Sequence, residues 1–266
     1  MKLVHFVVVY AFVAATPALA ADRLTDRDVK GLVARIEDGR DRFDNALDDK
    51  LKDSIVRGPG GEANVGRFLD DFQEGIDRLE ERLKPEYAGS AEAAALLRQA
   101  SAIDRFFRQQ PPGTRGESEW NRLGTDLKAL AAAYGAEFPL SEGAIVRRIG
   151  DRELASAVDE IARSAARLKR SLDSDLKKDA SVGKPARDAI VHEADALSKD
   201  AKTLGNRVKD GKPSSAEAAR VMDRAAKLRA FIDSHQVPAS STGWAAITPR
   251  METLAGAYGT TWPATR

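Results

Sequence analysis

The stretch WNRLGTDLKALAAAYGAEFP, residues 120–139, returns at residues 244–263 as WAAITPRMETLAGAYGTTWP. In both copies, large apolar residues follow one another at intervals of 3, 4, 3 and 4 residues. This spacing places five large side chains on one stripe of an α-helix, which is typical of a helix in an antiparallel bundle. The stripes consist of Trp120, Leu123, Leu127, Leu130 and Tyr134 in the first copy, and of Trp244, Ile247, Met251, Leu254 and Tyr258 in the second.

Both stripes end in the same way. Gly135 and Gly259 follow the last stripe residue, where a helix commonly needs a left-handed C-terminal cap. Phe138 and Trp262 come three residues later, and each is followed by a proline that stops the helix. The sequence therefore predicts two copies of one helical unit, each closed by a helix of this kind.

Further segments match when the sequence is shifted by 125 residues. Leu24–Asp28 aligns with Ile149–Glu153, and Ser90–Ala94 aligns with Ser215–Ala219. The apolar positions between these segments also coincide, and no stretch alternates with a period of two. We therefore expect an all-α protein without a sheet, made of two tandem antiparallel four-helix bundles that arose by internal duplication.

The boundary between the two units has no Pro/Ser-rich linker. Ile145, Val146 and Ile149 lie there and read as buried residues, which favours two bundles packed end to end or sharing a near-continuous helix. The first helix of each unit is expected at about residues 26–53 and 151–179. The predicted organisation is a first bundle at 21–140, a connection at 141–149 and a second bundle at 150–266.

The N-terminus has the pattern of a secretory signal peptide, residues 1–20. Lys2 is followed by an apolar run from Leu3 to Ala15, and Ala18-Leu19-Ala20 fits the small-x-small cleavage pattern. About 13 apolar residues are too few to cross a hydrocarbon core of ~30 Å. We expect cleavage after Ala20 and a mature bacterial protein in the periplasm or outside the cell, with no membrane insertion.

Charge is balanced over the whole chain and unequal between its halves. Without Lys2, the chain carries 41 basic and 41 acidic side chains. Residues 21–148 hold 21 basic and 25 acidic groups, whereas residues 149–266 hold 20 and 16. The balance gives no reason to expect nucleic-acid binding. The net charges of −4 and +4 suggest an unknown protein partner or self-association through oppositely charged units.

The sequence offers no constellation for catalysis or metal binding. It has no cysteine, and only His192 and His235 remain after cleavage. These histidines align with Arg67 and Gln110, which favours solvated positions. No Glu-x-x-His pair, as found in di-metal bundles, occurs. We therefore expect neither an enzyme nor a resident cofactor or metal.

The aromatic ends of the closing helices allow two interpretations. Trp120 with Tyr134, and Trp244 with Tyr258, are expected to fill the ends of each core. The alternative is a paired aromatic pocket, which would make the protein a carrier or sensor of a small apolar ligand or of non-covalent haem. The favoured function is a non-enzymatic binding or scaffold module of the envelope.

Overall fold

The computed structural model describes residues 23–59, 61–84, 87–179, 181–235 and 238–262, with the backbone only for 238–242. The predicted signal peptide therefore lies outside the described residues. The chain is mostly helical, with a few short strands, as the all-α prediction requires. None of the described helices has both the length and the apolarity that crossing a membrane demands.

The first half of the chain contains five helices and four short strands among its described residues. In order, they are α1 (Asp26–Ala46), α2 (Asp49–Lys52), β1 (Ile55–Gly58), β2 (Gly61–Asn64), α3 (Val65–Arg82), β3 (Leu83–Lys84), β4 (Tyr87–Ala88), α4 (Ser90–Phe107) and α5 (Glu117–Ala133). The described part of the second half contains α6 (Asp151–Leu176), α7 (Lys184–Lys209), α8 (Ser215–His235) and α9 (Pro238–Ala257).

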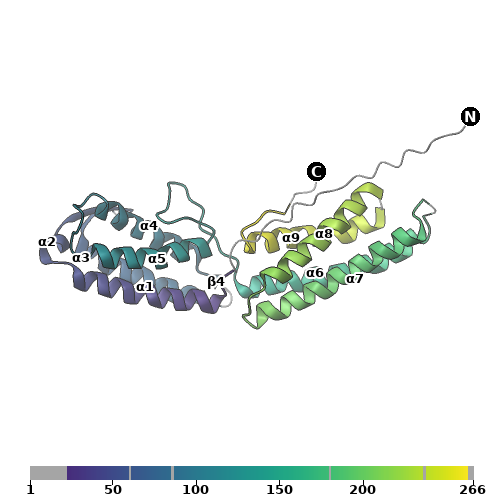
Figure 1. Cartoon of the computed structure of the whole chain (residues 1–266), viewed down its shortest axis with the longest axis horizontal. Coiled ribbons are helices and arrows are strands. Elements are labelled where there is room, and N and C mark those ends of the chain that lie inside the picture. The colour runs from purple at the N-terminus through teal and green to yellow at the C-terminus, as the bar shows by residue number, and fades with distance from the viewer. Residues whose placement is uncertain (1–22, 60, 85–86, 180, 236–237, 263–266) are drawn as a thin grey trace, which may run out of the picture.

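The two halves have separate hydrophobic cores. One core gathers buried side chains of α1, α3, α4 and α5, and the other gathers those of α6, α7, α8 and α9. Figure 1 shows the two groups of helices following each other along the long axis of the molecule. Every residue of the two predicted stripes is buried, because α5 packs along α1 and α9 packs along α6.

The prediction of no sheet is wrong in the first half. β1 and β2 form an antiparallel ribbon in which Gly58 pairs with Gly61, and β3 and β4 form a second, shorter ribbon. Gly61 has a φ of 106°, which favours glycine. A Cβ on Gly58 would lie 2.4 Å from the ring of Phe68, so glycine lets this hairpin rest directly on α3.

The first helix is also shorter than predicted. α1 ends at Ala46, Leu47 is extended, and the Asp48 side chain accepts the backbone N–H of Leu51 at 2.9 Å to start α2. In the second half, α6 is continuous to Leu176. Asp48 caps α2 in the first half, whereas its counterpart Asp173 lies inside the continuous α6, so the aspartate alone does not account for the break.

The connection between the halves is a loop rather than a shared helix. Ile145 is 81% exposed, which corrects the expectation that it is buried, whereas Val146 and Ile149 are half-buried. The loop folds back on the first half, because Arg147 N–H donates to the Tyr134 carbonyl at 2.9 Å. Backbone bonds of this kind fix the loop without requiring Ile145 in the core.

Candidate functional site

The two halves meet where α1 and α6 begin. The backbone N–H of Asp26 donates to Oδ2 of Asp151 at 2.8 Å, and the N–H of Asp151 donates to Oδ2 of Asp26 at 2.9 Å. Each carboxylate therefore caps the first turn of the other half's helix, where free N–H groups and the helix dipole favour negative charge. Asp26 and Asp151 occupy positions that are 125 residues apart.

Two arginines complete this arrangement. Arg148 donates to Oδ1 of Asp26 at 2.8 Å and to the carbonyl of Leu24 at 2.7 Å. Arg23 makes the corresponding bonds, to Oδ1 of Asp151 and, at 2.5 Å, to the carbonyl of Ile149. The side chains of Arg148 and Arg23 are 2% and 9% exposed. We call Arg23, Asp26, Arg148 and Asp151 the reciprocal clamp.

The two carboxylates of the reciprocal clamp are bonded by its own members, whereas Nε of Arg148 is buried and has no hydrogen-bond partner in the described part of the chain. Two guanidinium groups and two helix N-termini neutralise two carboxylates that lie close together. Bonds of this charge-assisted kind are directional, so they set how the halves are oriented. Removing one member would leave a partly buried charge without its partner.

The tyrosines of the repeat signature lie near the clamp residues. The Tyr134 hydroxyl donates to the Ala88 carbonyl at 2.6 Å, and the Tyr258 hydroxyl lies 2.7 Å from Oγ of Ser214. Burial raises the pKa of both phenols above the ordinary value, although Arg148 opposes this for Tyr134. Both hydroxyls therefore stay protonated at neutral pH and tie the closing helix to the neighbouring turn.

The tryptophans lie in the cores but differ in their polar contacts. Trp120 contacts the rings of Phe43 and Phe107, and its Nε1 donates to Oδ1 of Asp104 at 3.2 Å. Trp244 is 5% exposed, and its Nε1 is buried without a hydrogen-bond partner among the described residues. Position 229, which aligns with Asp104, is an arginine. The same apolar spacing thus carries two different polar environments.

The remaining signature residues lie at the ends of the closing helices. Gly135 and Gly259 have φ angles of 68° and 65°, the left-handed conformation that the sequence suggested. Phe138 and Trp262 are buried to a similar degree, at 8% and 9% exposure. Nε1 of Trp262 is another buried donor that finds no partner in the part of the chain that the structure describes.

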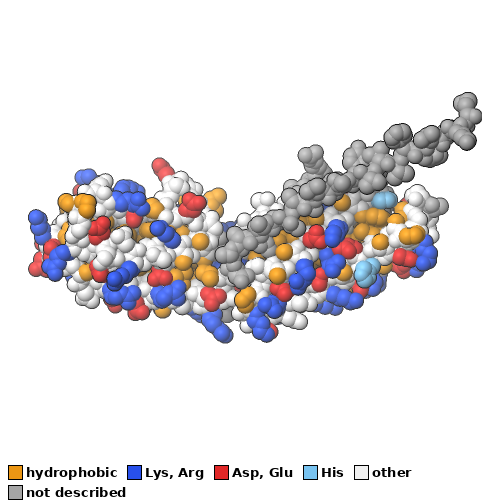
Figure 2. Space-filling view, in the orientation of Figure 1, with side chains coloured by type: hydrophobic (Ala, Val, Ile, Leu, Met, Phe, Trp, Pro, Cys, Tyr) orange, Lys and Arg blue, Asp and Glu red, His pale blue; other side chains and the backbone are white. Residues whose placement is uncertain are grey.

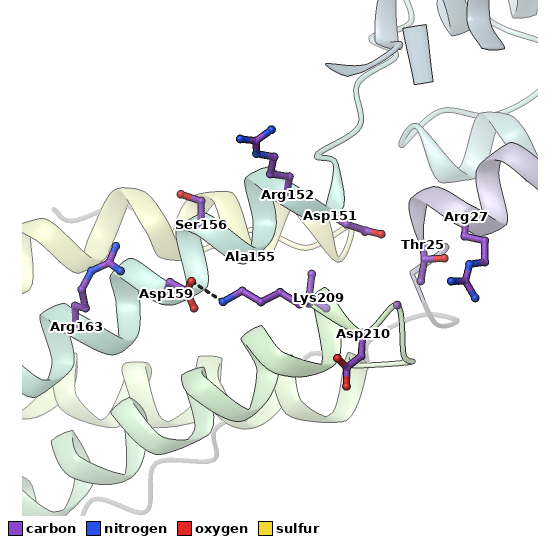
Figure 3. Close-up of a pocket in the computed structure, with 12 residues that line it drawn as sticks. Thr25, Arg27, Asp151, Arg152, Ala155, Ser156, Asp159, Arg163, Lys209 and Asp210 are labelled. Atoms are coloured by element: carbon purple, nitrogen blue, oxygen red, sulfur yellow. Dashed lines mark hydrogen bonds and ion pairs between the residues drawn. The ribbon is translucent and has the colours of Figure 1, made fainter. Parts of the chain in front are cut away.

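The largest hollow that we describe is an open groove beside the reciprocal clamp, with a volume of about 620 Å³. Figure 3 shows α6 and the end of α7 forming its sides, with Thr25 and Arg27 of the first half at one end. Across it, Lys209 pairs with Asp159 at 2.7 Å. The charged residues that line this junction groove are Arg27, Asp151, Arg152, Asp159, Arg163, Lys209 and Asp210.

The groove has different chemistry from the corresponding surface of the first half. Ser156, Asp159 and Arg163 in the groove correspond to Gly31, Ala34 and Asp38, one repeat earlier. The clamp is therefore shared by both halves, whereas Ser156, Asp159 and Arg163 of the groove have no counterparts of the same kind in the first half. Mixed charge and a wide opening suit contacts with a polar partner better than enclosure of an apolar molecule.

The described residues were also compared with the arrangement that a metal ion requires. No cluster of three or more His, Asp or Glu that could hold a metal is present in that part of the chain. His235, at the end of α8, stacks on Phe231 with ring centroids 4.1 Å apart. The signature tryptophans and tyrosines line none of the three hollows that we describe.

The sequence contains a repeated pattern at the clamp that the alignment of the two halves alone does not explain. Arg23-Leu24-Thr25-Asp26 and Arg148-Ile149-Gly150-Asp151 share an arginine three residues before an aspartate at a helix start. Comparison of the chain with protein-family models, curated proteins and solved structures finds no match.

Proposed function

We propose that the protein is an exported, non-enzymatic binding or scaffold module of the bacterial envelope, made of two tandem four-helix bundles that arose by duplication. The observation that carries the proposal is the reciprocal clamp. Its buried charged groups hold one half against the other, and the two cores are filled by their own side chains. A pair of units in a fixed orientation suits a protein that presents surfaces to partners.

The reciprocal clamp also bears on the proposed export. Cleavage after Ala20 would leave Arg23 as the third residue of the mature chain, with its clamp bonds intact. Intact mass measurement of protein recovered from the periplasm of an exporting host should give a chain that begins at Ala21. A mature chain that lacks Arg23 would contradict this reading, because half of the clamp would be missing.

A second candidate function rests on the two orphan indole donors of the second half. Nε1 of Trp244 and of Trp262 is buried, and no acceptor for either is found in residues 23–262 as far as the structure describes them. A buried unpaired donor is costly, and an acceptor on a bound molecule would satisfy it. This favours the alternative of a carrier of a small, largely apolar ligand or non-covalent haem in that half. Trp120, bonded to Asp104, gives no such reason in the first half.

Native mass spectrometry of protein recovered from the exporting compartment separates the two functions. The scaffold function predicts a mass equal to that of the bare chain, or a multiple of it, or a complex with another protein. A small-molecule mass that is lost on denaturation would instead support the carrier. Self-association through the −4 and +4 halves would appear as a dimer that dissociates at high salt.

The scaffold function also predicts which protein complexes depend on the clamp. Crosslinking in the exporting host should trap the same protein partners with the unaltered chain and with variants outside the clamp. Arg148→Ala should lose those partners that contact both halves. Complexes that survive this substitution unchanged would show that the orientation of the halves has no role in binding.

A further inference from the structure

A second cleft lies in the first half, away from the junction groove. It has a volume of about 480 Å³ and separates the β1–β2 hairpin from the loop that follows α5, with α4 as its floor. Volumes of this size are usual for small-ligand sites. The residues that line it are Arg57, Gly58, Pro59, Arg98, Ser101, Ala102, Arg105, Leu140, Ser141, Glu142 and Gly143.

Three arginines face this cleft, with one acidic residue, Glu142, among its lining side chains. Arg57 is paired with Glu62 at 2.6 Å on the hairpin. Arg98 and Arg105 are exposed and take part in no hydrogen bond or ion pair with the described residues. Like charges in one cleft repel one another, so an anion between them would be stabilised.

The walls of the cleft are held in place before any ligand arrives. The hairpin rests on Phe68 through Gly58, where any Cβ would clash. On the other side, Leu140 N–H donates to Oγ of Ser101 at 2.9 Å, and this hydroxyl donates to the Leu97 carbonyl at 2.7 Å. Ser101 is buried, so the bond anchors the loop to α4. A preformed site avoids the ordering cost of assembling its walls on binding.

The spacing of the two unpaired arginines indicates the size of the ligand. Arg98 and Arg105 are seven residues apart on α4 and therefore lie on the same face, roughly 10 Å apart along the helix axis. This backbone spacing favours two separate anionic groups, one for each guanidinium group, over a single phosphate or carboxylate. A molecule with two or more anionic groups can bridge them.

The two unpaired arginines have no arginine counterparts in the second half. Arg98 and Arg105 align with Asp223 and Ala230, and Asp223 pairs with Lys227 at 2.7 Å. The segment that aligns with the hairpin instead forms a turn and the first residues of α7. The pair of arginines is thus a property of the first half alone, the half with a net charge of −4.

We propose that the cleft between the β1–β2 hairpin, α4 and residues 140–143 binds a small soluble oligoanion, held by Arg98 and Arg105 with support from Arg57. The site adds a ligand to the proposed scaffold function and does not depend on it. Glu142 at the rim opposes the anion and therefore limits affinity. Binding should weaken as salt rises, because these guanidinium groups are exposed.

The test uses the mature full chain and inorganic tripolyphosphate as the probe, measured by calorimetry in dilute salt. Arg98→Gln with Arg105→Gln should weaken binding by at least about tenfold, because a tenfold step corresponds to about 1.4 kcal/mol and each lost charge-assisted bond is worth at least that much. The matched control, Arg42→Gln with Arg115→Gln, removes two other exposed arginines and should leave binding within about twofold. Glu142→Gln should tighten it.

Hydrogen exchange locates the ligand independently of affinity. Tripolyphosphate should slow exchange at Arg57, Gly58 and residues 140–143, which line the two sides of the cleft, and leave α6–α9 unchanged. The proposal is overturned if the unaltered chain does not bind the probe, or if the control variant weakens binding as much as the Arg98 and Arg105 variant. Binding to phosphatidylglycerol vesicles without binding of tripolyphosphate would also overturn it.

Discussion

The two halves of this chain agree at their junction and differ at their far ends. Arg23 donates to Asp151, and its counterpart Arg148 donates to Asp26. The backbone N–H groups of Asp26 and Asp151 likewise each donate to the other's carboxylate across the junction. Away from it, the first half turns through a β-hairpin, whereas the second half extends α7 backward to Lys184. Residues that hold the halves together share their chemistry, and residues that face solvent do not.

The difference at the turns arises from few residues. Leu51 and Val65 enclose the same number of positions as Leu176 and Ile190. In the first half the segment contains Gly58-Pro59-Gly60-Gly61, which favours a tight turn between two strands. In the second half, Pro185 lies in the first turn of α7, where its missing N–H is no loss.

The largest expected effect comes from removing a signature tryptophan. Trp120→Ala and Trp244→Ala should each lower the free energy of unfolding by about 3–5 kcal/mol, because both rings are buried in a core. Urea denaturation followed by circular dichroism measures the change. If Trp244→Ala left the stability unaltered, the ring would not be a core residue, and the carrier alternative would gain support.

Breaking the clamp should have the next largest effect. Arg148→Ala and Arg23→Ala should each cost about 2–3 kcal/mol, below the range for a fully buried pair because the carboxylate partners are partly exposed. Comparing the two variants is informative because the two arginines make equivalent bonds. If either variant cost much more than the other in denaturation experiments, the clamp would not be reciprocal in energy.

The double variant Arg23→Ala with Arg148→Ala sharpens this comparison. Residues of one network are not additive, so its cost should be smaller than the sum of the two single costs. Arg122→Ala, which removes an exposed arginine of α5, is a control and should cost less than about 0.5 kcal/mol. Strict additivity would indicate two independent ion pairs.

A milder substitution tests the polar difference between the tryptophans. Trp120→Phe should cost about 1 kcal/mol more than Trp244→Phe, because it removes the donor to buried Asp104 whereas the Trp244 indole has no acceptor to lose. The ring loss is similar in both variants and cancels in the difference. Equal costs would mean that the Trp120–Asp104 bond contributes nothing to stability.

Substitutions at the first residues of the helices should change the stability least, and one of these changes should depend on pH. Thr25 caps α1, and its hydroxyl donates to Asp28 at 2.7 Å, which lowers the pKa of Asp28 below its ordinary 3.8. Thr25→Val should cost about 1 kcal/mol at neutral pH. The part of this cost that comes from the Asp28 carboxylate depends on pH: because its folded pKa is depressed, that part is complete above the unfolded pKa and is lost as pH falls through the folded pKa. A cost that stayed constant in acid would contradict the assignment.

α6 offers the converse experiment. Its N-cap, Gly150, makes no side-chain bond, and its φ of −69° suits any residue. A Cβ there would meet Oδ2 of Asp26 at 3.5 Å, an ordinary contact. Gly150→Ser should therefore raise the melting temperature slightly, by the few tenths to 1 kcal/mol that distinguish serine from glycine caps. A decrease would show that the clamp needs glycine at this position.

The periodic spacing of apolar residues predicted the helices well, because burial of one face of a helix dictates that spacing. The stripes from Trp120 to Tyr134 and from Trp244 to Tyr258 needed only the 3.6-residue helical repeat and a core to face. Periodicity failed for Ile145, which is apolar but lies in a loop whose backbone bonds hold it outward. It failed again at the hairpin, where short strands depend on glycines rather than on alternation.

The candidate sites were harder to predict, since they join residues that are distant in the sequence. Arg148 and Asp26 are 122 residues apart, and only the packing of the halves brings them into contact. Arg57 and Arg98 line the same cleft only because Arg57 lies on a hairpin that the sequence did not indicate. The repeated Arg-x-x-Asp pattern was the one signal available, and its meaning depends on the N-termini of α1 and α6 lying opposite each other.

The most direct test of the fixed orientation is a distance distribution between spin labels on the two halves. The chain has no cysteine, so Lys128→Cys on α5 and Lys202→Cys on α7, both exposed, provide unique attachment points. The account predicts one narrow distribution that broadens when Arg23→Ala and Arg148→Ala are added. A broad distribution in the chain with an intact clamp would contradict it.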